Sequence, residues 1–215
     1  KEFKPDILHA HYASSYGFLG GLSGFHPFIL SVWGSDVFDF PKISPIYKWI
    51  LKFNLKKADK ICSTSYVMKE EVRKYTDKDI YVVTFGVDLN IFKPFYALHV
   101  FKGTPIVIGT VKHLEKEYGI EYLIEAFVLL RKQVKGHPVK LLIVGGGSLD
   151  AELKAKVRDL EIAGETVFTG FIPPDEIPFY QNMLNISVFP SLKESFGVSV
   201  VEAMACEKPV VVTDI

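Results

Sequence analysis

The sequence has few cysteines, no excess of either charge and no long hydrophobic run. Its two cysteines, Cys62 and Cys206, follow no metal-binding or redox spacing, so we expect reduced thiols and a cytoplasmic setting rather than a disulfide. Because 25 basic residues balance 25 acidic ones, bulk electrostatics do not favour a nucleic-acid partner. The longest apolar runs, residues 141–144 and 210–212, have the length of strands, which excludes a membrane-spanning segment among them.

What the sequence does contain is an alternation of apolar, strand-like runs with helical patterns. Such alternation predicts an α/β fold with open, mostly parallel sheets and helices on both faces. The predicted strands cover residues 6–10, 28–33, 60–63, 80–84, 106–111, 139–144, 166–168, 185–189 and 209–213. The predicted helices cover residues 15–24, 44–56, 65–75, 119–134, 148–161, 174–182 and 197–206.

The alternation breaks over residues 91–105, where prolines and a glycine bracket an irregular, aromatic stretch. A hydrophobic content of 48% over 215 residues is sufficient for one to two domains. We therefore expect a first lobe over residues 1–95, a hinge over 96–105 and a second lobe over 106–215.

Glu194 and Glu202 are the most informative residues of the chain. The segment from Val198 to Cys206 is apolar on every side, which predicts a buried helix with Glu202 as its one charge. A buried carboxylate is destabilising by several kcal/mol unless something pairs with it or the helix opens onto a cleft. The alternative is that Glu194 is a solvated loop residue and Glu202 a charge satisfied inside the protein.

The surrounding pattern places both glutamates at one edge of a sheet. A loop with the first glutamate and a helix with the second connect the apolar runs 186–190 and 209–213. Such a βαβ unit has its ligand crevice at the carboxyl end of its first strand. The backbone N–H groups of residues 196–198 begin the helix, and a helix N-terminus attracts anions. The sequence therefore predicts a ligand with hydroxyl groups for the carboxylates and phosphates for the N–H groups.

Residues 194–205 read E-S-F-G-V-S-V-V-E-A-M-A. This run resembles the E-x-F-G-x-x-x-x-E-A-M-A motif of the retaining glycosyltransferases of family 4, the glycosyl transferases group 1, which have the two-lobed GT-B fold. Residues 85–94 resemble the family's G-V-D-x-x-x-F-x-P segment, and residues 118–127 resemble its K-G-I-D-x-L-I-x-A-F helix.

The resemblance implies a fold of two Rossmann-like lobes, the first on the acceptor side and the second binding a nucleotide sugar. It implies a hexosyltransferase that moves a sugar from this donor to a glycan or lipid-linked acceptor in polysaccharide biosynthesis. No cofactor is implied, since the nucleotide sugar is a substrate.

The resemblance also implies roles for individual residues. Glu194 is expected to act catalytically beside the transferred sugar, and Glu202 is expected to hold the ribose. The residues after the first glutamate are expected to bind the donor through their backbone: Ser195, Phe196, Gly197 and Val198. Backbone groups that select the base are expected at Gly170, Phe171 and Ile172.

A glycine-rich turn, Gly145, Gly146 and Gly147, follows the apolar run 141–144. Glycines allow a backbone to approach a ligand closely. The turn matches neither G-x-G-x-x-G nor the P-loop spacing, so a tight turn of structural origin is an equal alternative. In the family the equivalent loop lines the nucleotide side of the site, which would make these glycines donor-binding.

Two lysines, Lys112 and Lys116, follow the predicted strand 106–111 and are the candidates for binding the diphosphate as it leaves. The family usually has an arginine and a lysine here, in a pattern similar to G-R-L-x-x-x-K-G. The loop of this chain is longer by about one residue, so the register of the two lysines stays open. Lysine supplies the charge of arginine but not its forked hydrogen bonds. A solvated loop of mixed charge is the alternative.

The first lobe offers His11 and Asp36. His9 and His11 end a strand, and the resemblance puts His11 at the rim of the site as a candidate catalytic residue; a hydrogen-bonded structural histidine is the alternative. Residues 31–36 resemble the family's H-G-x-D strand end, with Trp33 where many members have histidine. Asp36 either binds an acceptor hydroxyl or caps a turn.

The run Asp77, Lys78 and Asp79 matches the D-x-D pattern through which a different class of glycosyltransferases binds a divalent metal. It lies in a polar turn just before the predicted strand 80–84, where aspartates are expected from turn chemistry alone. Because the lysine loop and the helix N-terminus offer positive charge for the phosphates without a metal, we expect no metal requirement.

Both ends of the chain resemble interior parts of the family pattern, so we expect a fragment of a longer protein. Two other functions stay open: a nucleotide-sugar-binding lobe without turnover, and a sugar-nucleotide epimerase of similar architecture. Aromatic and basic residues over 42–57 suggest contact with the inner membrane surface, although a solvated helix face is the simpler explanation.

Overall fold

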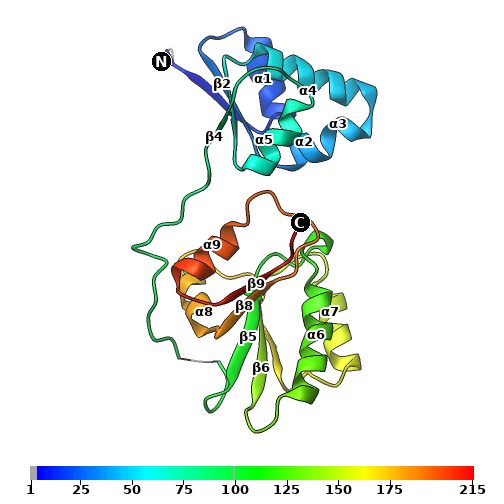
Figure 1. Cartoon of the computed structure of the whole chain (residues 1–215), viewed down its shortest axis with the longest axis vertical. Helices are drawn as coiled ribbons and strands as arrows, with labels where there is room; N and C mark the ends of the chain where they lie inside the picture. Colours follow the sequence, from blue (N-terminus) through cyan, green and yellow to red (C-terminus); the bar gives the residue numbers. More distant parts are fainter. Residues whose placement is uncertain (1–3, 99) are drawn as a thin grey trace. The chain divides into compact units, whose positions relative to one another are not determined.

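The computed structural model describes residues 4–98 and 100–215. The chain folds as two compact units that divide between Phe85 and Gly86, and each unit has a parallel sheet flanked by helices (Figure 1). This confirms the predicted α/β class. Residues 1–3 of the predicted first lobe and residue 99 of the predicted hinge lie outside the described residues.

The first unit has a four-stranded sheet in the order β1-β2-β3-β4, with every neighbouring pair parallel. Its strands are β1 Leu8–His11, β2 Phe28–Val32, β3 Lys60–Ser63 and β4 Ile80–Val82. Its helices are α1 Ser15–Ser23, α2 Ser35–Phe38, α3 Phe40–Ile43, α4 Pro45–Lys57 and α5 Tyr66–Arg73. Side chains of β2 form the centre of the core because this strand has neighbours on both edges.

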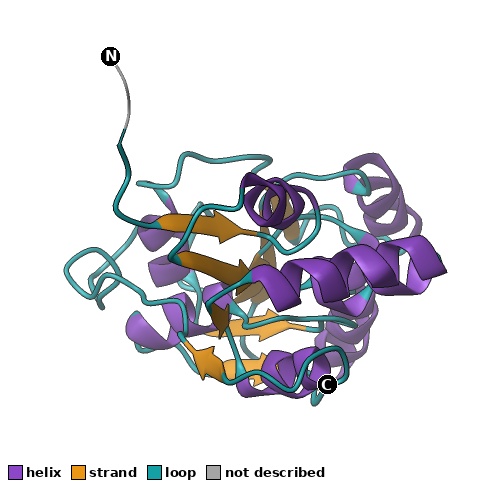
Figure 2. Cartoon of the chain, turned by 90° about the horizontal axis from the view of Figure 1, so that it is seen from above, coloured by secondary structure: helices purple, strands orange, loops and turns teal. Residues whose placement is uncertain are grey.

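The second unit has a five-stranded parallel sheet in the order β7-β6-β5-β8-β9. Its strands are β5 Ile106–Val111, β6 Val139–Val144, β7 Thr166–Phe168, β8 Ile186–Phe189 and β9 Val210–Val212. Its helices are η1 Lys116–Tyr118, α6 Ile120–Gln133, α7 Asp150–Asp159, α8 Ile177–Met183 and α9 Val198–Ala205. In both units the helices pack against the strands (Figure 2).

The strand order of the second unit sets the position of a ligand site. The chain passes from β5 outward through β6 to β7 and then returns to β8 on the other side of β5. In open parallel sheets, ligands bind at the carboxyl ends of the strands where the order reverses in this way. The loops after β5, β6 and β8 all begin at this edge.

The predicted strands and the longer predicted helices are present, with bounds that differ by a few residues. Two short helices, α2 and α3, and the 3₁₀ turn η1 were not predicted because they are too short to show a helical period. Residues just before the predicted hinge pack with the second unit, since the Asn182 side chain accepts from Phe95 N at 3.1 Å and donates to Lys93 O at 3.0 Å. The hinge itself stays a prediction.

The apolar runs of the sequence are strands in the structure. Residues 141–144 belong to β6 and residues 210–212 form β9. Over the described residues, 4–98 and 100–215, no helix combines the length and the apolar character that crossing a membrane requires.

Gly109 lies in the central strand β5, where a side chain would collide with the neighbouring strand. A Cβ at this position would lie 2.0 Å from Leu142 O and 2.8 Å from Leu184 Cδ2. We expect Gly109→Ala to destabilise the second unit by about 2–3 kcal/mol, because overpacked cores must shift their backbone. Urea denaturation followed by circular dichroism measures the change. Gly164→Ala is the control, since nothing lies within 4 Å of its Cβ; an equal loss in both variants would contradict the prediction.

Candidate functional site

A cavity of about 180 Å³ opens at the carboxyl-end edge of the second sheet. The loop after β5, the turn after β6 and the helices α8 and α9 all contribute to its lining. Five of the predicted site residues line it: Lys112, Gly145, Phe171, Ile172 and Glu202. The structure thus brings together residues that are up to ninety positions apart in the sequence, from 112 to 202.

Glu194 and Lys112 form an ion pair beside this cavity. Lys112 Nζ donates to Glu194 Oε2 at 2.6 Å, and the two side chains are 10% and 24% exposed, so water screens the pair only in part. Lys112 Nζ also lies 4.4 Å from the centre of the Tyr118 ring, within the range of a cation–π contact. The second oxygen of Glu194 accepts from Ser195 N at 3.1 Å. The predicted catalytic glutamate and one predicted phosphate-binding lysine therefore hold each other in place.

Glu202 lies in α9 with its carboxylate at the cavity. Among the described residues, the carboxylate has no hydrogen-bonding partner, and the positive charge of Lys112 lies close enough to act on it. Burial raises the pKa of Glu202, and the Lys112 charge opposes this shift only in part. The sequence left two alternatives for Glu202: a helix that opens onto a cleft, or a charge satisfied inside the protein. The geometry favours the first.

The prediction that the helix around Glu202 is buried on all sides is wrong. In α9 only Ala203 is fully buried, whereas Met204 is 57% exposed. One face of α9 packs on the sheet and α8, and another faces the cavity. The apolar composition of 198–206 hid this difference because valine and alanine occur at both kinds of surface.

The residues between the two glutamates form the turn into α9. Gly197 has φ +83, a left-handed conformation that strains any residue with a side chain, and it is the N-cap of the helix. Its carbonyl accepts from Val200 N and Val201 N, which fixes the first turn. Ser195, Phe196 and Val198 flank this turn outside the cavity lining, and Ser199 of the first helical turn lines the cavity instead.

The glycine turn after β6 has a structural reason for each of its glycines. A Cβ on Gly145 would lie 2.1 Å from Lys112 O, and one on Gly147 would lie 2.5 Å from Leu114 O. A Cβ on Gly146 would lie 2.6 Å from the Phe171 ring. The turn therefore packs directly on the backbone of the loop that carries Lys112. This supports the structural alternative for 145–147, although Gly145 also lines the cavity.

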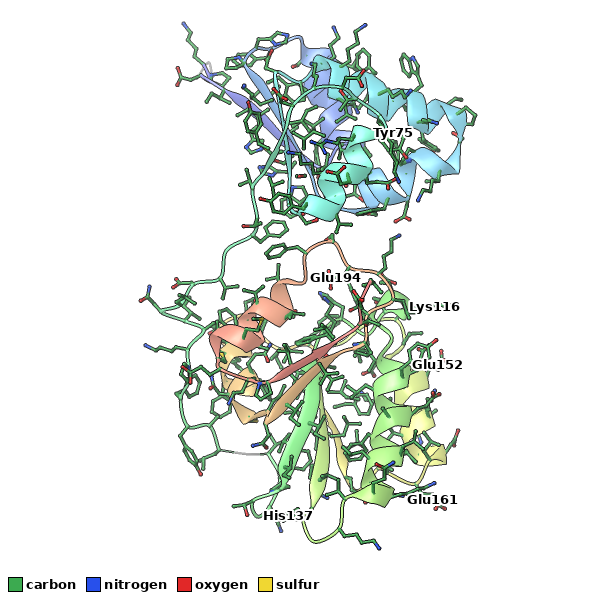
Figure 3. All side chains as sticks on the ribbon, viewed as in Figure 1. Tyr75, Lys116, His137, Glu152, Glu161 and Glu194 are labelled. Carbon is green, nitrogen blue, oxygen red and sulfur yellow. The ribbon has the colours of Figure 1, made fainter. Side chains whose placement is uncertain are left out.

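The loop after β5 separates the two candidate lysines. Lys112 lines the cavity, whereas Lys116 begins η1 with an exposed side chain and is not part of the lining. Figure 3 labels Lys116 and Glu194, which belong to the loops after β5 and β8. Between Lys112 and Lys116 in sequence, Glu115 accepts from Ser148 N at 2.8 Å and ties the start of η1 to the loop before α7.

Two aromatic side chains of the lining, His113 and Tyr118, were not predicted as site residues. His113 and Phe171 contact each other edge to face, with ring centres 5.8 Å apart. Tyr118 lies on the Lys112 side, and burial together with the charge of Glu194 raises the pKa of its hydroxyl. No motif marked His113 or Tyr118 as lining residues; their position depends on the loop conformation. Gly170, also predicted here, has φ +72 and its carbonyl accepts from Gly145 N at 3.1 Å.

The first unit holds a separate small cavity of about 170 Å³ at the carboxyl ends of its strands, and His11 lines it. The rings of His9 and His11 are 4.1 Å apart, and Trp33 meets His11 edge to face at 5.5 Å. His9 Nε2 is 2.8 Å from Ser31 Oγ, and burial lowers the pKa of this histidine. His9 is therefore the hydrogen-bonded histidine of the pair, and both His9 and His11 line the cavity.

Asp36 is fully buried and binds the backbone of its own unit. Its carboxylate accepts from Ala13 N at 2.6 Å, Gly34 N at 2.7 Å and Trp33 N at 3.1 Å. Burial raises the pKa of Asp36 against the effect of these three hydrogen bonds. The geometry supports the turn-capping alternative over contact with an acceptor hydroxyl.

Two family models match the chain. One, described as glycosyl transferases group 1, matches residues 97–215, and another, described as glycosyl transferase 4-like, matches residues 1–65. The chain belongs to the glycosyl transferases group 1 family. Its Glu194 and Glu202 lie within the part that the first model matches, which confirms the family resemblance read from 194–205.

Known proteins similar to this group 1 chain include the capsular polysaccharide biosynthesis glycosyltransferase CapM of Staphylococcus aureus, 30% identical over 79% of this chain and 48% of that protein. Sucrose-phosphate synthase of Thermosynechococcus elongatus has a similar structure, with a TM-score of 0.81 and 22% identity over 97% of this chain and 56% of that chain. HepE of Anabaena, solved in complex with UDP and glucose, gives a TM-score of 0.77 at 20% identity over 96% and 59%. These structures establish the GT-B fold. The chain spans about half the length of these relatives.

The raised pKa of Glu202 in this group 1 chain predicts a pH-dependent penalty on stability. A carboxyl whose pKa rises on folding binds its proton more tightly in the folded state, so stability decreases as pH rises from 4.5, its ordinary value, through the raised value. We expect Glu202→Gln to be more stable than the parent at pH 7, by less than about 1 kcal/mol because the group is partly solvated, and equal to it near pH 4. Urea denaturation at both pH values measures this.

Glu152→Gln on the exposed side of α7 is the matched control and should show no such difference. A Glu202→Gln variant that is less stable than the parent at pH 7 would show that the carboxylate makes a favourable contact in the folded protein.

Proposed function

We propose that this chain carries the donor-binding part of a retaining glycosyltransferase, which transfers a sugar from a nucleotide sugar to a glycan or lipid-linked acceptor without a metal. The observation that carries the proposal is that one cavity is lined by both a carboxylate without a hydrogen-bonding partner, Glu202, and a cation, Lys112. Ribose offers hydroxyl donors for the first group, and a diphosphate offers negative charge for the second. The proposal includes a cytoplasmic location with contact to the inner membrane surface.

Glu202 would accept hydrogen bonds from the ribose hydroxyls. Its carboxylate is partly desolvated and lacks a donor, so a ligand that supplies two hydroxyl groups would restore hydrogen bonds lost on folding. A cavity of about 180 Å³ is smaller than the ~300–1,000 Å³ of most small-molecule sites. We assign it to the nucleoside part of the donor, against the edge-to-face pair His113 and Phe171.

Lys112 would exchange one anion for another during the reaction. Without donor it pairs with Glu194 at 2.6 Å; with donor, the leaving diphosphate would compete for the same ammonium group. Preorganised charge at the leaving group is commonly the largest contribution to catalysis of group transfer. The exchange would free the Glu194 carboxylate to act beside the transferred sugar. The retaining outcome rests on the family resemblance of residues 194–205.

The comparisons support the substrate classes of this proposal. CapM is named as a capsular polysaccharide biosynthesis glycosyltransferase, and HepE was solved with UDP and glucose, so UDP-sugars and polysaccharide-type acceptors are the first to test. Because the chain spans about half of its relatives, a donor-binding part without turnover of its own is the main alternative.

Nucleotide binding tests the proposed donor site. We expect saturable calorimetric titration of the 215-residue chain by one class of nucleotide among UDP, GDP and ADP and their sugars. Glu202→Ala should weaken this binding at least tenfold, because hydrogen bonds to a charged group contribute about 1.5–3 kcal/mol. Glu152→Ala, which removes an exposed carboxylate of α7, is the control. A folded chain that binds none of the nucleotides would overturn the proposal.

The two lysines after β5 can be separated by the same titration. We expect Lys112→Ala to weaken binding of the nucleoside diphosphate at least tenfold, because the lysine lines the cavity and contacts Glu194. Lys116→Ala should change the affinity less than about twofold, since its side chain is exposed and outside the lining. The reverse order would assign the diphosphate to Lys116. Circular dichroism of each variant confirms folding.

A further inference from the structure

The first unit has an exposed helical surface with aromatic, aliphatic and basic side chains. We call it the α3–α4 face and define it by residues of α3 and α4 that point to solvent: Lys42, Ile43, Ile46, Trp49, Lys52 and Lys56. Ile43, Ile46 and Trp49 are 66%, 70% and 60% exposed. Large apolar side chains this exposed are not required for the core of the unit.

The inner side of α4 accounts for its helical fold without these residues. Leu51 and Leu55 are fully buried in the first core, and the buried Asn54 donates to Ala13 O at 2.7 Å. Ile46 and Trp49 lie about half a turn away from this inner side, because residues of an α-helix advance by 100° each. The α4 helix thus has two apolar stripes, one buried in the core and one exposed.

Ring contacts hold the tryptophan of the exposed stripe in place on α4. Trp49 stacks on Phe53 at a ring distance of 5.5 Å and an interplanar angle of 20°, and Phe53 meets Phe18 of α1 edge to face at 6.0 Å. Helix α1, which packs against α4, contains no charged residue and exposes Tyr16, Leu19 and Leu22. An aromatic ring held by stacking loses little conformational freedom when it enters an apolar phase.

The charged residues within α3 and α4 have one sign, and Asp39 lies just before α3 as its N-cap. Between Phe40 and Ala58 the sequence has five lysines and no acidic residue: Lys42, Lys48, Lys52, Lys56 and Lys57. The next carboxylate in the sequence, Asp59, accepts from Phe28 N at 2.7 Å and lies 2.6 Å from His26 Nδ1, so it already has partners. Helices that contain lysines, no acidic residue and exposed aromatic side chains are typical of helices that lie in a membrane interface.

We propose that the α3–α4 face binds the surface of a bilayer that contains anionic lipids. The lysine ammonium groups would contact the lipid phosphates, while Trp49, Ile46 and Ile43 enter the region between headgroups and acyl chains. The contact is peripheral and lies in the first unit, so it is independent of the proposed nucleotide site of the second. It would bring the chain to the surface where a lipid-linked acceptor is found.

Vesicle sedimentation tests the electrostatic part of this proposal. The 215-residue chain should sediment with vesicles of phosphatidylglycerol and phosphatidylcholine, and much less with phosphatidylcholine alone. Reversing two charges in Lys52→Glu/Lys56→Glu should weaken this binding at least tenfold. Lys132→Glu/Lys135→Glu changes the net charge equally at exposed positions of the second unit and should leave binding within about twofold of the parent. Circular dichroism and nucleotide titration of both variants exclude unfolding as the cause.

Tryptophan fluorescence tests insertion separately. The chain has two tryptophans, so in a Trp33→Phe background the emission comes from Trp49 alone. Anionic vesicles should shift this emission to the blue, and brominated acyl chains should quench it. Equal loss of binding in the two charge variants, absence of a Trp49 shift, or stronger binding to duplex DNA than to the vesicles would each overturn the proposal.

Discussion

The close packing of the glycine turn 145–147 on the loop after β5 is the contact on which the candidate site depends. The turn leaves no room for a side chain, since a Cβ on Gly145 would lie 2.1 Å from Lys112 O. Hydrogen bonds from Lys112 N to Val144 O and from Leu114 N to Gly146 O fix the two segments together. This backbone contact fixes the main chain of Lys112 at the cavity, where its side chain pairs with Glu194 and lines the same cavity as Glu202.

The sequence predicts the strands well because parallel strands buried on both faces are continuous apolar runs, as in residues 106–111 and 139–144. The sequence also predicts the edge of the sheet at which Glu194 and Glu202 lie. The alternation of strands and helices makes the strands parallel, so their carboxyl ends meet at one edge. It does not predict α2 or α3, each only four residues long, in which propensity has too few residues to act.

The details of the site depend on distances that no pattern contains. The apolar residues around Glu202 predict a buried helix. Such a pattern cannot distinguish a helix face that lines a cavity from one that packs in the core. Asp36 lies in a motif-like strand end, and its contact with Ala13 N joins residues 23 positions apart, which only the tertiary fold reveals. The choice between Lys112 and Lys116 likewise depends on the loop conformation, which places Lys112 in the cavity lining and Lys116 outside it.

The charges of the site raise a question about how it would bind an anion. Glu194 and Glu202 carry two negative charges near one lysine, so a diphosphate would enter a region that is not yet positive. Two features reduce this cost: the raised pKa of Glu202 makes its proton easier to keep, and the N-terminus of α9 adds a partial positive charge beside Glu194. In the proposed mechanism the donor must still take Lys112 from Glu194. Binding of the donor and release of the Glu194 carboxylate from Lys112 would then occur together. The ion pair with Lys112 would neutralise this carboxylate until a sugar is present.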